Sequence, residues 1–217
     1  PPPFVLTESG QAGLVVAAAN RTALDLGITP GLRFTDARAR APQLLSGEID
    51  READVRGLRG LAAWMVHWTP LTALDGLDGL MLETTGCDHL HGGEAAMVTA
   101  LSRRLTRAGY VHRIGLAGTP GAASALARAA AREGVPALLP EGTERDGLAE
   151  LPVAALRLSS EAVTLLRRFG LTRIGQLYGI DRKALARRFQ SRDMADAACL
   201  RLRPCGAPAM SRAHRQQ

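Results

Sequence analysis

Apolar residues along the chain alternate between strand-like and helix-like spacing, which is typical of α+β or α/β architecture. Near the N-terminus, short apolar runs flank a turn at residues 8–10 and predict a hairpin. Two helical patterns follow, and they end at Gly27 and Pro42. The strands are expected at residues 4–6 and 14–19, and the helices at residues 22–26 and 34–40.

A longer amphipathic helix is predicted over residues 49–68, because apolar side chains recur there at i, i+3 and i+4 spacing. Its apolar face comprises Val55, Leu58, Leu61, Ala62 and Met65. Beyond it, strands are expected at residues 80–84 and 111–117, and helices at residues 94–108 and 120–132. This order of strand, helix, strand and helix predicts a mixed sheet with helices on one face.

The composition changes after Gly134, where Pro136, Pro140 and a polar run at residues 141–147 predict a domain boundary. Residues 151–189 then have a helical pattern throughout. No periodicity continues beyond residue 190, so we expect the tail to be disordered.

The overall composition is that of a folded globular chain, with 46% hydrophobic and 22% charged residues in 217. No apolar run approaches the roughly 18 residues that would span a bilayer, and the N-terminus lacks the pattern of a signal peptide. Cys87, Cys199 and Cys205 are widely spaced and odd in number, which favours a reducing compartment. We therefore expect a cytoplasmic protein with no membrane partner.

The charge of the chain points to nucleic acid. Basic residues number 27 against 21 acidic residues, the net charge is +6, and Lys183 is the one lysine among 26 arginines. Guanidinium groups bind two phosphate oxygens at once, so an arginine-rich surface suits a nucleic-acid backbone. A GC-rich genome also raises arginine content without selection for binding, and this alternative stays open.

The most specific candidate for phosphate contact lies at residues 165–177, where an apolar–Gly–apolar hairpin joins two helical patterns. This is a helix-hairpin-helix pattern, in which exposed backbone N–H groups could hold a DNA phosphate. The predicted DNA-binding residues are Gly170, Arg173, Gly175, Arg182 and Lys183. An ordinary corner between two helices, with a glycine after the first, has the same pattern.

Two other segments have less specific patterns. The turn around Thr119 and Pro120 joins a strand to a helix and could attract an anion, but a threonine N-cap followed by proline explains it equally well. His89 and His91 lie close in sequence, yet zinc would need further ligands that are not nearby.

Asp75, Asp78 and Glu83 are candidates for a carboxylate site. Two-metal phosphoryl transfer needs several carboxylates that converge on an ion pair, usually from adjacent strand ends. Asp78 stands beside glycine, so an aspartate in a turn is the simpler local interpretation.

Taken together, the order of these segments resembles a Y-family translesion DNA polymerase over residues 4–189. The resemblance implies an α+β fold with a palm, a small fingers subdomain and a helical thumb that contains the helix-hairpin-helix. The corresponding segments are fingers 4–50, palm 51–135, thumb 150–189 and a tail 190–217. Shorter motifs, among them residues 85–87, 92–94 and 118–123, resemble the ImuB branch of that family, a polymerase-like subunit of a bacterial mutagenesis complex.

Several catalytic motifs of the family are changed here. Its Ser-Ile-Asp-Glu motif falls on residues 76–79, which keeps Asp78 and loses the glutamate. The Tyr and Arg that hold the incoming triphosphate fall on Arg21 and Leu24, and an Asn-Lys pair falls on residues 119–120. The first palm strand, with its metal-binding aspartate, would precede this sequence. We expect no metal, cofactor or catalytic residue, with Asp78 as a remnant.

The resemblance implies a non-catalytic subunit that binds DNA weakly and without sequence preference. It would act in SOS-induced error-prone translesion synthesis and DNA repair, with an error-prone replicative-type polymerase subunit, a sliding clamp and a RecA-like accessory protein as partners. Two alternatives remain: an active Y-family polymerase whose missing carboxylate lies upstream, and a helix-hairpin-helix DNA-binding module fused to a structural domain.

Overall fold

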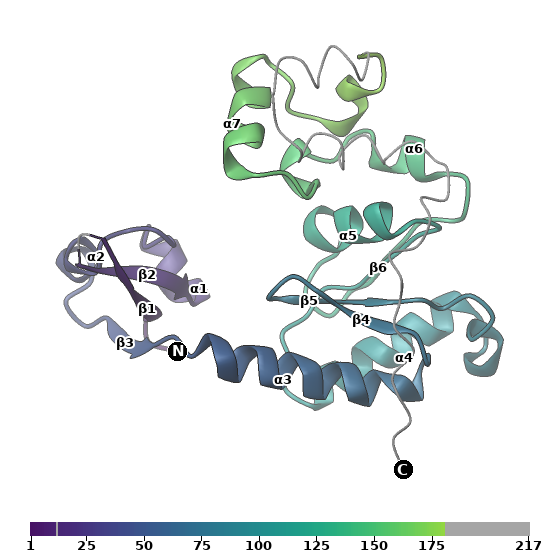
Figure 1. The fold of residues 1–217 in the computed structure, drawn as a ribbon, viewed down its shortest axis with the longest axis horizontal. Coiled ribbons are helices and arrows are strands. Elements are labelled where there is room, and N and C mark those ends of the chain that lie inside the picture. The colour runs from purple at the N-terminus through teal and green to yellow at the C-terminus, as the bar shows by residue number, and fades with distance from the viewer. Residues whose placement is uncertain (12, 181–217) are drawn as a thin grey trace. The chain divides into compact units, whose positions relative to one another are not determined.

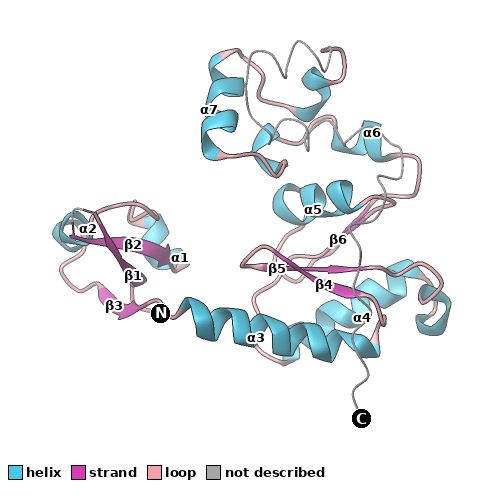
Figure 2. Cartoon of the chain, in the orientation of Figure 1, coloured by secondary structure: helices cyan, strands magenta, loops and turns pink. Residues whose placement is uncertain are grey.

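A computed structural model describes residues 1–11 and 13–180. It contains two compact units, the first formed by Pro1–Leu61 and the second beginning at Ala62 (Figure 1). Both units combine helices with strands, as Figure 2 shows, which agrees with the predicted α+β class. Within the described residues, none of the helices combines the length and the hydropathy that crossing a membrane requires.

The first unit is a three-stranded sheet with two short helices. Its strands are β1 (Phe4–Gly10), β2 (Gly13–Ala19) and β3 (Leu45–Glu48), and its helices are α1 (Arg21–Asp25) and α2 (Phe34–Arg40). The central β1 runs antiparallel to β2 and parallel to β3. The predicted hairpin is confirmed, but its turn lies beyond Gly10, because residues 8–10 pair with residues 13–15 instead of turning.

A small aliphatic core holds this unit together. Its buried members are Val5, Val16, Ala23, Ile28, Ala37, Ala41 and Leu44. Asn20 caps α1 by accepting the Ala23 amide proton, which satisfies one of the N–H groups that the first turn of a helix leaves free. The sequence pattern gave no sign of β3, since its four residues do not alternate between apolar and polar.

Helix α3 (Arg51–Trp64) begins in the first unit and continues into the 3-10 turn η1 (Met65–His67). The predicted helix is therefore confirmed, with a tighter last turn. Its apolar face is half-buried at Val55 and Leu58 and becomes fully buried at Met65. Trp68 is also buried, which supports core packing as its role.

The second unit has more helix than sheet. Its strands are β4 (Thr72–Asp75), β5 (Gly79–Leu82), β6 (Gly115–Leu116) and β7 (Ala137–Leu138). Its longer helices are α4 (Glu94–Arg107), α5 (Pro120–Ala129) and α7 (Ser160–Arg168), and its shorter ones are η2 (Asp88–His91), α6 (Glu144–Leu148), η3 (Val153–Ala155) and η4 (Ile174–Leu177).

The described strands of the second unit do not form the single mixed sheet that was expected. They pair as two short ladders, β4 antiparallel to β5 and β6 parallel to β7. The strand predicted at residues 111–117 is reduced to β6, because residues 111–113 form no regular ladder: the His112 carbonyl accepts a single amide, from Gly134, and the Tyr110 carbonyl is bonded to the ring of His112. The hydrophobic pattern of a sequence indicates which residues prefer burial. Which strands pair with each other depends on segments that are distant in sequence.

Helix α5 lies at the centre of the second hydrophobic core. Its small buried residues Ala122 and Ala125 let other segments approach closely. The remaining buried members of this core are Leu126, Leu148, Ala155, Leu156 and Ile174. The core therefore joins residues on both sides of the predicted boundary at 136–147, so this stretch connects parts that pack together instead of separating two domains.

The segment predicted to be helical from residue 151 contains, as far as residue 180, three short helices with extended backbone between them. Ser159 caps α7 by accepting the Ala162 amide proton, and Gly170, with a φ of 76°, follows the end of this helix. The remainder of the predicted thumb and the tail at 190–217 lie outside the described residues.

Candidate functional site

The β4–β5 hairpin carries two of the candidate carboxylates. Asp75 ends β4 and pairs with Gly79, the first residue of β5, so that residues 76–78 form the turn. Gly76 has a φ of 72°, a left-handed conformation that glycine adopts without strain. As a result, Asp78 lies on an exposed turn, whereas Asp75 lies at the buried end of a strand.

Position 79 of the hairpin has no room for a side chain. A Cβ atom there would lie 2.9 Å from the carbonyl oxygen of Asp75, closer than real Cβ contacts. Because this neighbour is a backbone atom, it cannot swing aside as the end of a flexible side chain could. The position onto which the resemblance places the family's glutamate therefore requires glycine in this backbone conformation.

Each aspartate of the hairpin faces an arginine. Asp75 forms an ion pair with Arg157, and its side chain is only 11% exposed. Asp78 lies 3.9 Å from Arg128 on α5, and both of these side chains are largely exposed. Neither arginine can be recognised from the sequence, because both belong to segments far from the hairpin and no local motif marks them.

Glu83, just after β5, is held by hydrogen bonds instead. Both the hydroxyl and the backbone N–H of Thr85 donate to its carboxylate. These bonds stabilise the charged form and hold the pKa of Glu83 below its ordinary value, against a smaller opposing effect of burial. The carbonyl oxygen of Glu83 also accepts a hydrogen bond from Thr69.

The carboxylates of this hairpin do not fit a pair of metal ions. Such a pair needs several carboxylates around two ions about 4 Å apart. Here Asp75 and Asp78 face guanidinium groups, while Glu83 is turned toward Thr85. Within the described residues, His, Cys, Asp and Glu side chains nowhere gather in a group of three or more that could hold a metal ion.

The turn before α5 is the second candidate site. Thr119 caps the helix by accepting the Ala122 amide proton, and Pro120 takes the first helical position, as the simpler interpretation predicted. Glu144 lies against this turn: its Oε1 would be 2.5 Å from a Cβ atom built at Gly118. Since Glu144 is only 3% exposed, the space beside Gly118 is filled by a buried acidic side chain.

The histidine segment folds into the short helix η2. His91 stacks on the ring of Trp68, with a distance of 4.7 Å between ring centroids. The guanidinium of Arg104 lies 6.0 Å from the same ring. In this arrangement His91 packs against an aromatic side chain.

The helix-hairpin-helix candidate differs most from its prediction. Every backbone N–H from residue 170 to residue 176 donates a hydrogen bond within the chain. The Gly170 amide donates to Arg167 and the Gly175 amide donates to Ala149, while the side chain of Gln176 accepts two more amides. The predicted contact between exposed hairpin amides and a DNA phosphate is therefore not available in this conformation.

Among the predicted DNA contacts, Arg173 is the one that has a side chain and lies within the described residues. Its guanidinium forms an ion pair with Glu150 and remains 56% exposed. The carboxylate of Glu150 therefore competes with a phosphate for this side chain. Arg182 and Lys183 lie outside the described residues.

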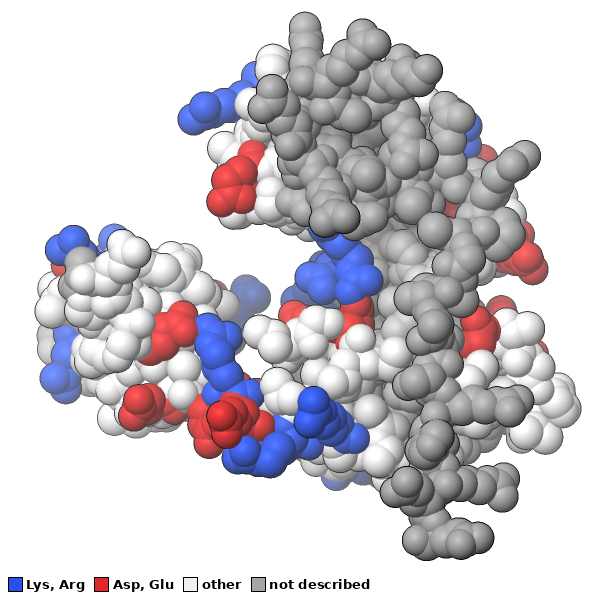
Figure 3. All heavy atoms as spheres, viewed as in Figure 1, with Lys and Arg blue, Asp and Glu red and all other residues white. Residues whose placement is uncertain are grey.

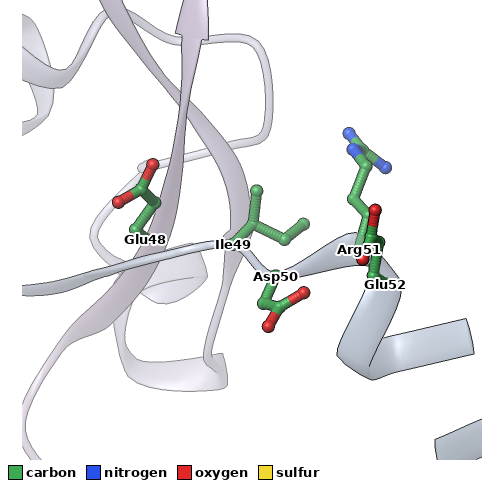
Figure 4. Close-up of a pocket in the computed structure, with 5 residues that line it drawn as sticks. All are labelled: Glu48, Ile49, Asp50, Arg51 and Glu52. Carbon is green, nitrogen blue, oxygen red and sulfur yellow. The ribbon is translucent and has the colours of Figure 1, made fainter. Parts of the chain in front are cut away.

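A shallow pocket in the first unit is lined by residues 48–52. Figure 4 shows that the carboxylates of Glu48 and Asp50 point away from each other. Arg51 pairs with Glu8, and the carboxylate of Asp50 accepts the Ala53 amide proton, so these polar groups serve the fold of the unit itself.

Comparison with known sequences identifies the family. The profile of the impB/mucB/samB family matches residues 2–128, which is more than half of the chain. The chain belongs to this family. The predicted resemblance to the Y-family, and to its ImuB branch, is thereby confirmed.

Two groups of relatives cover about three quarters of the chain. Protein ImuB of Caulobacter vibrioides (strain NA1000 / CB15N) is 45% identical over 164 residues, which are 76% of this chain and 35% of that protein. DNA polymerase IV of Dehalococcoides mccartyi (strain CBDB1) is 29% identical over 165 residues, 75% of this chain and 42% of that protein. The chain thus spans about a third of the ImuB length and less than half of the polymerase.

Solved structures with the same fold are Y-family polymerases. DinB from Sulfolobus solfataricus matches 92% of this chain and 59% of its own, with a TM-score of 0.73 and 16% identity. The insertion ternary complex of Dbh DNA polymerase matches 91% of this chain, with a TM-score of 0.71 and 18% identity. The fold therefore resembles the catalytic core of these polymerases.

Proposed function

We propose that this chain is the polymerase-like core of a non-catalytic subunit that acts in DNA damage tolerance. The 45% identity with Protein ImuB supports this assignment over the polymerase IV relatives at 29%. In this proposal the subunit binds DNA weakly and assists an error-prone polymerase in SOS-induced translesion synthesis in the cytoplasm.

The observation that carries the non-catalytic part is the β4–β5 hairpin. Its position 79 has no space for a side chain, and arginines face its two aspartates. Loss of metal-site carboxylates removes most phosphoryl-transfer activity, because nothing else then positions the ions against the developing charge. A cation at Asp75 would first have to displace Arg157.

The candidate nucleotide contacts support the same proposal. Arg21, at the position of the family's tyrosine, is engaged with Asp25 at 3.1 Å. Leu24 and Pro120 stand where the family has cations, and neither can bind a phosphate by charge. Several charge-assisted hydrogen bonds, worth roughly 1.5 to 3 kcal/mol each, are absent from these positions.

Primer extension by the full-length protein that contains this chain tests the proposal. We expect no nucleotide incorporation with magnesium or manganese, and no micromolar dNTP binding by calorimetry with magnesium present. An active Y-family polymerase would be the control for template and buffer. Incorporation that Asp78→Ala abolishes would refute the non-catalytic assignment.

That result would support the second candidate, an active Y-family polymerase with a carboxylate upstream. The identity with DNA polymerase IV and the retained Asp78 favour this candidate. The third hypothesis, a helix-hairpin-helix DNA-binding module fused to a structural domain, would survive only if no palm-like sheet were present. The likeness in fold to DinB and Dbh over more than nine tenths of the chain argues against it.

The partners in this proposal are DNA, an error-prone replicative-type polymerase subunit, a sliding clamp and a RecA-like accessory protein. The family resemblance is their support. The thumb assignment of residues 150–189, with a helix-hairpin-helix that contacts DNA through side chains such as Arg173, belongs to the same proposal.

A further inference from the structure

We propose that Arg157 serves as a permanent counterion of Asp75, and that this ion pair latches the β4–β5 hairpin to the segment leading into α7. The guanidinium group of Arg157 thus neutralises the carboxylate of Asp75, which the hairpin would otherwise present to a metal cation. The inference goes beyond the proposed function, because it concerns what the remaining acidic residues do once catalysis is absent.

Both partners of the ion pair are held in place by their surroundings. Asp75 is fixed by its pairing with Gly79, and the missing side chain at Gly79 leaves its carboxylate unobstructed. Arg157 directly follows Ala155 and Leu156, which are buried in the core beside α5. The backbone on each side is therefore fixed, so the conformational entropy lost when the two side chains meet is confined to their own rotamers.

Burial decides how much the ion pair matters. The Asp75 side chain is 11% exposed, so a charge there without a counterion would cost far more than one on the surface. Arg157 is 49% exposed, and its own charge remains partly solvated. Loss of the arginine should therefore be costly, whereas simultaneous neutralisation of the aspartate should remove most of that cost.

The second ion pair of the hairpin provides a matched control. Asp78 and Arg128 lie 3.9 Å apart, with side chains that are 78% and 44% exposed. An exposed ion pair of this kind contributes little to stability. It joins the same hairpin to α5, but its aspartate is exposed and its two partners lie farther apart than those of the first pair. Figure 3 shows that blue and red side chains adjoin at several places on this face of the described residues.

A double-mutant cycle on the full chain tests the latch. Trp64 and Trp68 are the two tryptophans of the protein, and both lie in the second unit, so their fluorescence reports its unfolding in urea. We expect Arg157→Gln to lower the folding equilibrium constant about tenfold relative to Asp75→Asn/Arg157→Gln. The control cycle of Asp78→Asn and Arg128→Gln should show coupling below about twofold.

Each outcome is informative. If Arg157→Gln fails to fold while the double variant folds, the latch is supported. Equal stability of Arg157→Gln and the double variant would overturn it, as would coupling at the exposed pair as large as at the buried pair. Hydrogen exchange at the Glu83 amide, which donates to Leu71 beside the hairpin, should accelerate in Arg157→Gln and recover in the double variant.

The effect of magnesium on stability is an independent test of the latch. With Arg157 in place, the urea midpoint of the parent chain should be the same in EDTA and in millimolar MgCl2 at matched ionic strength. A magnesium-dependent rise that Asp75→Asn abolishes would show that the carboxylate serves a metal ion, and would overturn the latch. Neither readout depends on polymerase activity, so the latch and the non-catalytic assignment can fail separately.

Discussion

At the scale of a single residue, the ionisation of the Glu83 carboxylate is determined by its immediate neighbours. It follows β5 directly and accepts two hydrogen bonds from Thr85, which lower its pKa. A group whose pKa is lower in the folded chain than in the unfolded chain stabilises the fold at high pH. This contribution is complete above the ordinary glutamate pKa of about 4.3 and is lost as the pH falls through the lower value of the folded chain.

Thr85→Ala should therefore raise the pKa of Glu83 toward its ordinary value, because the strongest of these hydrogen bonds is lost. The carboxyl resonance of Glu83, followed by NMR through a pH titration, measures this change directly. The stability difference between the parent and the variant should be larger at pH 7 than below the folded pKa, where both carboxyl groups are protonated. Thr84→Ala is the control, because only the backbone of Thr84 acts on Glu83; an equal pKa rise there would contradict the assignment.

At the scale of elements, the contact between β6 and α5 depends on a glycine. A Cβ atom at Gly115 would lie 2.3 Å from the Ala123 carbonyl oxygen and 2.5 Å from the Ala127 nitrogen. Both neighbours are backbone atoms of α5, so the strand approaches the helix as closely as a chain without a side chain allows.

Gly115→Ala should destabilise the second unit by about 1 to 3 kcal/mol, because strand and helix must move apart. Urea unfolding followed by tryptophan fluorescence measures this loss. Gly179→Ala is the control in the same unit, since a Cβ atom there meets nothing within 4 Å and should leave the urea midpoint nearly unchanged. Equal effects at the two positions would mean that general glycine replacement, and not the contact with α5, causes the loss.

The hairpin after α7 was predicted to bind a DNA phosphate through its backbone amides. Glycine spacing predicted free amides for a phosphate, but Gln176 accepts two of them and residues 149 and 151 accept two others. Satisfied amides stabilise the fold and cannot also hold an anion. A DNA contact at this element would therefore rely on guanidinium groups.

At the scale of the whole molecule, the net charge of +6 favours weak association with nucleic acid. Each phosphate that a basic side chain neutralises should add about −0.7 to −0.9 to the slope of log affinity against log salt. We expect Arg173→Glu combined with Lys183→Glu to flatten this slope for primer-template DNA, as measured by fluorescence anisotropy.

Arg38→Glu combined with Arg59→Glu makes the same change in net charge on helices of the first unit and is the matched control. If both double variants flatten the slope equally, net charge alone governs binding. If the thumb variant keeps the parental affinity and slope, the thumb is no DNA contact, and a protein-binding role becomes the better interpretation. Glu150→Gln should have the opposite effect and strengthen binding, because it frees Arg173.

Local sequence determined most of the helices and the N-terminal hairpin. The span 34–40 was predicted to the residue, and the helix at 94–108 ended within one residue of α4, because helices are stabilised by contacts three and four residues apart. The sequence motifs also identified the family and located the remaining aspartate. The short strands β3, β4 and β7 escaped prediction. The partners of β3 and β7 are remote in sequence, and none of the three strands shows an alternation of apolar and polar residues.

Only the tertiary structure determined which charged side chains and backbone amides contact each other. Asp75 meets an arginine 82 positions later, Glu144 stands against the turn before α5, and the hairpin amides are bonded to residues 149, 151 and 176. Sequence determines which side chains carry charge or donate hydrogen bonds, because that is covalent chemistry. Which of them face each other depends on how buried segments pack, and no local pattern encodes that choice.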